Sequence, residues 1–156
     1  MSLFVCPLCG KALQAEEHRR VCKNGHSFDL AREGYVNLLL SQKSRAAHHG
    51  DDAKMVTARR RFLERGFYAP LRDALIALCL DRAEKGVRLL DAGCGEGYYT
   101  AAAVSALEAA GLAPEAAGAD ISREAVRYAA KRDRSREWAV ASVFRLPVAA
   151  KRIDLL

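Results

Sequence analysis

The sequence has no long hydrophobic run, no internal repeat and no low-complexity segment. Because a membrane-spanning helix needs about 20 apolar residues in succession, no segment is predicted to cross a bilayer. The first six residues lack both the basic start and the long apolar core of a secretory signal peptide. By elimination we expect a cytoplasmic protein with no membrane partner. The 156 residues, 51% hydrophobic and 28% charged, suit a globular chain of one or two small domains.

Cysteine is scarce, and its number is odd: Cys6, Cys9, Cys22, Cys79 and Cys94. In a reducing compartment such cysteines are expected to be metal ligands or buried thiols rather than disulfides. The formal charge of +6 is a mild basic bias, which is compatible with an anionic partner.

Two short motifs predict a zinc site. Cys6 and Cys9 form a C-x2-C pair, and Cys22 and His26 form a C-x3-H pair that follows after twelve intervening residues. Zinc in structural sites takes four Cys or His ligands in a tetrahedron, and these residues would fill all four positions. The predicted metal is therefore structural and not catalytic. The alternative is a set of unrelated buried thiols with a surface histidine. We interpret Cys79, on the apolar side of a predicted helix, as a core residue.

Three segments are predicted, with bounds at residues 1–40, 41–85 and 86–156. The first is rich in cysteine, glycine and polar turns and is taken as the zinc-binding module. The second opens with a polar connector over residues 41–50. It continues with one helix that Asp51 caps and that stops at Gly66, and a second helix with Pro70 in its first turn. In the second helix Leu71, Leu75 and Leu78 recur at helical spacing.

The third segment alternates apolar strand patterns with helix patterns. Strands are expected at residues 87–91, 116–120 and 138–141, with a fourth beginning at 153–156, and helices at 100–110 and from Ser122 to about 132. Alternation of this kind predicts an α/β fold with a parallel, doubly wound, Rossmann-like sheet.

A glycine-rich loop lies between the first strand and helix of that segment, with the sequence D-A-G-C-G-E-G over residues 91–97. It departs from the dinucleotide fingerprint because Tyr98 stands where the last glycine would be. The loop looks like the cofactor loop of class I S-adenosylmethionine-dependent methyltransferases. Gly93, Gly95 and Gly97 would let the backbone approach the cofactor, and Asp91 would lie near its amino-acid end. Asp120, which ends the next strand, can accept the ribose hydroxyls. The alternative is a glycine-rich turn that binds some other nucleotide.

The chain as a whole resembles the bacterial 23S rRNA (guanine-N1)-methyltransferases. The resemblance rests on the paired zinc motifs, on F-D-L-A-R-E-G-Y-V-N-L-L at 28–39, on A-R-R-R-F-L at 58–63, on G-F-Y-A-P-L at 66–71 and on the loop at 91–100. It implies zinc on Cys6, Cys9, Cys22 and His26. It also implies S-adenosylmethionine contacts at Gly95, Glu96 and Tyr68, and a homodimer.

The same resemblance implies that the chain methylates N1 of a guanine in a hairpin of 23S rRNA, with the module at 1–40 taking part in RNA recognition. Relatives continue past Leu156, so we interpret the chain as the N-terminal part of the enzyme. No residue can be assigned as the base that accepts the N1 proton. Tyr35, Tyr68, Tyr98 and Tyr99 could stack on bases or belong to the core, and the arginines at 59–61 could contact RNA or be a solvated face.

Two other functions stay open at this point. The chain could bind RNA through its zinc module without catalysing a reaction. It could also be a class I methyltransferase for a small molecule with an unrelated zinc ribbon, although the G-Y-V-N-L-L segment argues against this.

Overall fold

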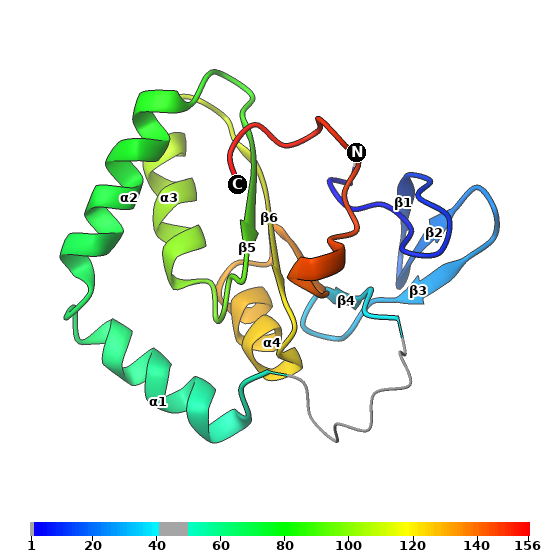
Figure 1. The fold of residues 1–156 in the computed structure, drawn as a ribbon, viewed down its shortest axis with the longest axis horizontal. Helices are drawn as coiled ribbons and strands as arrows, with labels where there is room; N and C mark the ends of the chain where they lie inside the picture. The colour runs from blue at the N-terminus through cyan, green and yellow to red at the C-terminus, as the bar shows by residue number, and fades with distance from the viewer. Residues whose placement is uncertain (1, 41–49) are drawn as a thin grey trace.

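The computed structural model describes residues 2–40 and 50–156, which form two sheets and four α-helices (Figure 1). The predicted connector over 41–50 lies, apart from Gly50, outside the described residues. None of the described helices is long and apolar enough to span a bilayer.

The first sheet is a small antiparallel one in the N-terminal module. It consists of β1 (Leu13–Glu16), β2 (Arg19–Cys22) and β3 (Ser27–Asp29) in that order. The two-residue turn between β1 and β2 pairs Glu16 with Arg19 and Leu13 with Cys22. This register places Cys22 at the end of its strand, where the chain turns towards His26.

The second sheet is parallel, as predicted, and the α/β fold class is confirmed. It consists of β4 (Tyr35–Asn37), β5 (Arg88–Ala92), β6 (Glu115–Asp120) and β7 (Glu137–Val140), in the order β4-β7-β6-β5. Its edge strand β4 comes from the segment that we assigned to the zinc module. The segment over residues 1–40 therefore contributes strands to both sheets.

The expected fourth strand of the third segment starts on the other side of β5. Leu155 forms an isolated parallel bridge with Leu89, and the backbone N–H of Leu90 donates to the Leu155 carbonyl at 2.9 Å. Asp154 supports this pairing, since its carboxylate accepts from the Arg88 guanidinium at 2.7 and 2.9 Å. These contacts place the segment after residue 153 beside β5, a position that the sequence pattern did not predict.

Helix α1 (Ala53–Glu64) is capped by Asp52, so the prediction that Asp51 is the cap was wrong. The Asp52 carboxylate accepts from the backbone N–H groups of Lys54 and Met55 at 2.8 and 2.9 Å, which leaves fewer helix-end donors without a partner. Asp51 instead forms an ion pair with Arg59 at 2.8 Å. Helix α1 stops before Gly66, as predicted.

Helix α2 (Ala69–Arg82) has a proline in its first turn, as expected, but it buries little of its surface. Leu71, Leu75 and Leu78 are 40 to 59% exposed, and only the side with Cys79 packs against the core beneath α3. Figure 1 shows α1 and α2 following one another as an arm around α3 and α4. The helical spacing of the leucines therefore predicted the helix correctly, but it does not identify the buried side.

The remaining helices, α3 (Tyr98–Ala109) and α4 (Arg123–Arg132), cover one face of the parallel sheet. Ser122 caps α4 as predicted, because its hydroxyl accepts from the Ala125 N–H at 3.2 Å. A short 3-10 helix, η1 (Val143–Arg145), follows β7.

The opposite face of the sheet is covered by the N-terminal module. One hydrophobic cluster joins Leu3, Phe4 and the zinc-motif residues Cys6 and Cys22 to alternate residues of the strands, namely Val36, Leu90, Ala117, Ala119 and Ala139. Successive strand residues point to opposite faces, so these positions form one side of the sheet. The module and the sheet therefore share a core.

A large aromatic ring packs directly on a glycine in the middle of the helix-covered face. Trp138 is only 2% exposed, and its indole N–H donates to the Asp133 carbonyl at 2.7 Å. A Cβ atom at Gly118, on the neighbouring strand, would lie 2.4 Å from the Trp138 ring. A side chain at residue 118 therefore cannot be accommodated unless the indole moves.

We predict that Gly118→Ala lowers the free energy of unfolding by about 1–3 kcal/mol, the usual cost of overpacking a core. The measurement is a urea titration followed by circular dichroism. In the double variant Gly118→Ala/Trp138→Leu the clash is gone, so its destabilisation should be smaller than the sum of the two single effects. Strict additivity would show that this contact does not limit the packing.

Candidate metal centre and cofactor loop

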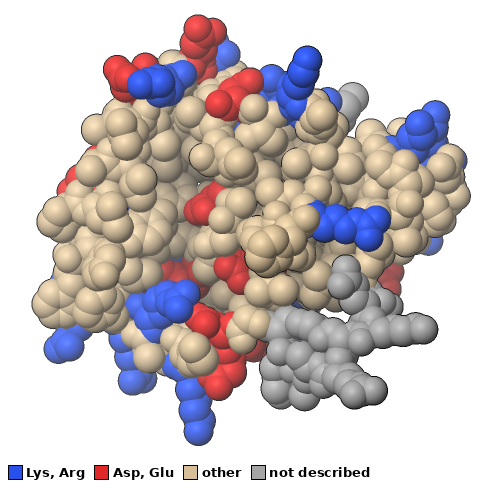
Figure 2. Space-filling model, in the orientation of Figure 1, with Lys and Arg blue, Asp and Glu red and all other residues tan. Residues whose placement is uncertain are grey.

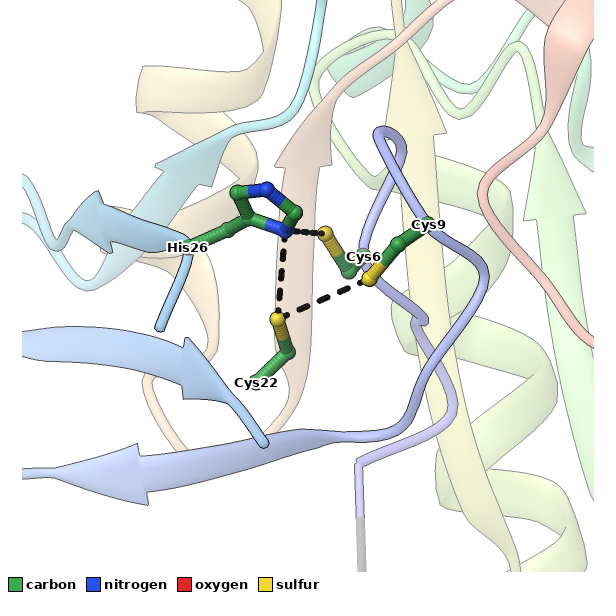
Figure 3. Close-up of side chains that lie close together, drawn as sticks. All are labelled: Cys6, Cys9, Cys22 and His26. Carbon is green, nitrogen blue, oxygen red and sulfur yellow. Dashed lines mark hydrogen bonds between the residues drawn. The ribbon is translucent and has the colours of Figure 1, made fainter. Parts of the chain in front are cut away.

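The structure brings the four predicted zinc ligands together (Figure 3). Their ligand atoms all lie within 4.8 Å of one another. His26 Nδ1 is 3.4 Å from the Sγ atoms of both Cys6 and Cys22, and the Sγ atoms of Cys9 and Cys22 are 3.7 Å apart. Two thiolates on one tetrahedral zinc are separated by about 3.8 Å, and a thiolate and an imidazole nitrogen by about 3.6 Å. The spacing of the four side chains therefore fits a zinc ion at their centre.

Two tight turns present these ligands. The Gly10 N–H donates to the Cys6 carbonyl, and the Gly25 N–H donates to the Cys22 carbonyl, each at 2.8 Å. Both glycines have positive φ values, 69° and 80°, which residues with a side chain rarely adopt. Gly10, just after Cys9, and Gly25, just before His26, thus allow the chain to reverse around the metal position.

The local backbone favours the charged thiolate form of one of these cysteines, Cys9. The N–H of Lys11 is the main cause that lowers the pKa of Cys9, to about 6. At Cys6 the main effect has the opposite sign, because burial raises the pKa of this thiol. A bound dication would favour the thiolate at every cysteine of the cluster.

We predict that purified protein contains about one zinc ion per chain and that Cys22→Ser loses it, because three ligands no longer close the tetrahedron. Metal analysis after gel filtration measures the content, and thermal melting should show a less stable protein. Cys79→Ser is the matched control, since Cys79 lies in α2 and outside the cluster. Equal zinc content in both variants would exclude this ligand set.

The glycine-rich loop connects β5 to α3 and is bonded to the end of β6. The N–H groups of Gly93 and Cys94 both donate to the Ala119 carbonyl, at 2.7 and 3.1 Å. The N–H of Gly95 donates to the Asp120 carboxylate at 3.0 Å. The loop is therefore held against the carboxyl end of the neighbouring parallel strand, the usual position of ligands in open α/β sheets.

Two carboxylates stand at this edge of the sheet. Asp120 accepts from the N–H groups of Gly95 and Ser122, one on each oxygen, which leaves a lone pair on both oxygens for a further donor. Asp91 accepts from the Thr100 hydroxyl at 2.6 Å, and burial raises the pKa of its carboxyl. Figure 2 shows acidic side chains in the hollow between the arm of α1 and α2 and the centre of the molecule, near these strand ends.

The side chain of Glu96, a residue that the resemblance predicts to contact the cofactor, is paired with a helix. Its carboxylate is 3% exposed and forms an ion pair with Arg132 of α4, whose Nε also donates to the Glu96 carbonyl at 3.2 Å. Arg132 therefore positions the backbone of the loop, and the Glu96 carboxylate is engaged with α4. Sequence reasoning missed Arg132, because its partner lies 36 residues away.

The aromatic residues near the loop divide into two groups. Tyr35 is buried at 4% exposure and accepts from Arg123 at 2.9 Å, so it belongs to the core. Tyr68, at the start of α2, is 44% exposed. Burial and then the neighbouring phenols of Tyr98 and Tyr68 raise the pKa of Tyr99. Tyr68 thus lies close enough to Tyr99, in the first turn of α3, to affect its pKa, and its contact with the cofactor stays a prediction.

Cys94, inside the loop, is a packing residue as predicted. Cys94 is 5% exposed, and a Cβ atom at Gly118 would lie 3.0 Å from the Cβ atom of Cys94. Burial is the first cause that raises the pKa of this thiol well above its usual value.

Comparisons with known proteins match two parts of the chain to different family models. The family model described as "RlmA, N-terminal", a zinc ribbon, matches residues 4–47, and one described as "Methyltransferase domain" matches residues 83–156. Two solved structures, Streptomyces venezuelae DesVI and the sugar N-methyltransferase KedS8 from Streptoalloteichus, resemble part of the chain. The first match has a TM-score of 0.42 at 23% identity and covers 58% of this chain and 36% of DesVI. The second has a TM-score of 0.46 at 20% identity and covers 67% of this chain and 40% of KedS8.

Three curated relatives match nearly the whole chain. YxjB of Bacillus subtilis and a protein of Micromonospora griseorubida, both provisionally named 23S rRNA (guanine-N(1)-)-methyltransferases, are 36% and 37% identical over 99% and 97% of this chain. The 23S rRNA (guanine(748)-N(1))-methyltransferase of Streptomyces fradiae is 38% identical over 89% of it. The chain spans 55%, 55% and 48% of these relatives, about half their length. The chain thus carries a zinc ribbon and a methyltransferase domain, and it is similar to the N-terminal halves or so of 23S rRNA (guanine-N1)-methyltransferases in sequence.

Proposed function

We propose that this chain is the zinc-ribbon and cofactor-binding part of an enzyme that transfers a methyl group from S-adenosylmethionine to N1 of a guanine in 23S rRNA. The observation that supports it most is the glycine loop bonded to Asp120 at the carboxyl ends of β5 and β6. The curated relatives are named for this reaction.

The residues at the strand ends suit this cofactor. Asp120 would accept the ribose hydroxyls with the lone pairs that Gly95 and Ser122 leave free. Asp91 would lie near the amino-acid end, directly or through water. Gly93 and Gly97 would let the backbone approach the cofactor, and Tyr68 would contact it from the start of α2. At residue 96 the backbone is the expected contact, because the carboxylate pairs with Arg132.

When bound, S-adenosylmethionine supplies an electrophilic methyl group on its sulfonium. The residues described here would orient the cofactor so that the guanine N1 can approach in line. The N1 proton must leave when the methyl group is transferred, and no described side chain is assigned as its acceptor.

Substrate binding is expected to involve the zinc module and the basic residues of α1. Arg59 and Arg60 are each paired, with Asp51 and Glu64 at 2.8 Å, and Arg61 is exposed. The carboxylates partly neutralise this face, so we expect further cations elsewhere to contribute to RNA binding.

A homodimer and a cytoplasmic location stay predictions. Light scattering on purified protein would test the homodimer.

We predict that Asp120→Asn weakens S-adenosylmethionine binding by about 1–3 kcal/mol, because an amide oxygen and an NH2 group cannot replace two carboxylate acceptors. Calorimetry with the purified protein measures the affinity. Asp73→Asn is the control, since Asp73 lies on an exposed part of α2 and pairs with Arg72. Equal affinity of wild type and Asp120→Asn would disprove the ribose assignment.

The reaction itself is tested with the complete enzyme of which this chain is the proposed part, together with labelled S-adenosylmethionine and unmodified 23S rRNA, since we expect residues 1–156 alone to be inactive. We predict incorporation of label and a stop in reverse transcription at one guanine, since a methyl group on N1 blocks base pairing. RNA binding without label transfer would favour the non-catalytic alternative. Transfer only to small molecules would favour the other alternative.

A further inference from the structure

A cavity lies where α1, α4 and the end of the glycine loop meet. Its volume is about 380 Å³, within the range of ligand pockets. It is lined by Arg60 of α1, by Tyr128, Lys131 and Arg132 of α4, and by Glu96. We call it the Tyr128 pocket. It opens beside α1, along whose outer edge Lys and Arg side chains project into solvent in Figure 2.

The aromatic ring in this pocket is surrounded by cations. The Arg60 and Arg127 guanidinium carbons lie 5.4 and 5.6 Å from the centroid of the Tyr128 ring, and Lys131 Nζ lies 5.8 Å from it. Tyr128 is only partly buried. Arg60 and Arg127 are paired with Glu64 and Glu124, at 2.8 and 3.3 Å, so the net positive charge beside the phenol comes from Lys131.

The charges of the lining do not cancel. Three cationic side chains face one carboxylate, that of Glu96, which is committed to Arg132. Arg60 shares its charge with Glu64 at 2.8 Å. In the described part of the chain no carboxylate forms an ion pair with Lys131. The ammonium group of Lys131 is thus available to an anion from solution.

We propose that the Tyr128 pocket is a second RNA-binding site of this chain, which takes one unpaired nucleotide with its base against Tyr128 and its phosphate near Lys131 and Arg60. Bases in an RNA duplex are stacked on each other, so only an unpaired base can place its face on a side chain. Cations beside an aromatic ring are the usual arrangement for single-stranded nucleic acid. The inference rests on the proposed function, because it assumes an RNA substrate.

The test measures binding of two fluorescein-labelled probes, a single-stranded 12-nucleotide oligoadenylate and a blunt 12-base-pair RNA duplex, at several KCl concentrations. Tyr128→Leu keeps apolar volume but removes the ring, and it should bind the single strand about 5- to 100-fold more weakly. Tyr128→Phe keeps the ring and should bind within about twofold of wild type. Thermal melting of all variants checks that each is folded.

Lys131→Gln should reduce the slope of log affinity against log salt by about 0.7 for the single strand, the value for one lost phosphate contact. Lys85→Gln, on the exposed turn before β5, is the matched control and should leave the slope unchanged. If Tyr128→Leu binds the single strand as wild type does, or loses duplex binding equally, the pocket does not stack a base. An unaltered slope in Lys131→Gln would remove the phosphate contact.

S-adenosylmethionine binding by the wild type is measured on the same samples. Failure to bind the cofactor would count against the proposed function, whatever the RNA probes show. Cofactor binding together with an unaffected Tyr128→Leu variant would overturn only the pocket.

Discussion

The contact between Trp138 and Gly118 sets the position of much of the helix-covered face. The indole ring occupies the space where a side chain of residue 118 would lie, so β6 and β7 can pack with a large ring between the sheet and α4. The same ring lies 3.1 Å from the place of a Cβ at Gly97, in the glycine loop. A shift of the indole would therefore move the loop and α4 together, since interiors are close-packed and transmit such displacements.

The opposite face of the sheet depends on the N-terminal module. A module with three short strands cannot bury enough apolar surface to be stable alone, and two aids are visible here. One is the cluster of three thiols and an imidazole, whose spacing fits a zinc ion. The other is the shared core, in which Cys6 and Cys22 pack with alanines of β6 and β7. The geometry of the metal cluster and the packing of the sheet are thus coupled through the same residues.

A network of ion pairs links α1, α4 and the glycine loop. Arg60 pairs with Glu64 on α1, Arg132 lies 3.7 Å from Glu64, and Arg132 also holds Glu96 in the loop. The Glu96 carboxyl is buried, and burial raises its pKa although Arg132 acts in the opposite direction. Breaking the pair would leave a buried carboxylate without its partner, which is costly. The helix that we expect to contact RNA is therefore connected by side chains to the loop that we expect to contact the cofactor.

Local patterns in the sequence were sufficient for the four helices, for the strands β5, β6 and β7 and for both motifs, but they did not predict the strands β1 to β4. The spacing of Cys6, Cys9, Cys22 and His26, the glycine loop and the strand–helix alternation are short-range features, because each depends on residues close together in the chain. The cap at Ser122 and the stop at Gly66 were predictable for the same reason. Asp51 and Asp52 are adjacent and chemically identical, so only the structure showed which one caps α1.

Features that join distant parts of the chain were decided by the tertiary structure. The pairing of β4 with β7 and the ion pair of Glu96 with Arg132 connect segments that the sequence does not relate. The leucines of α2 have the spacing of a buried face and are exposed, because which side of a helix is covered depends on what packs against it. Tyr128 lies in an ordinary run of basic residues in α4. Only the approach of α1 gives it the additional cation of Arg60 and a cavity.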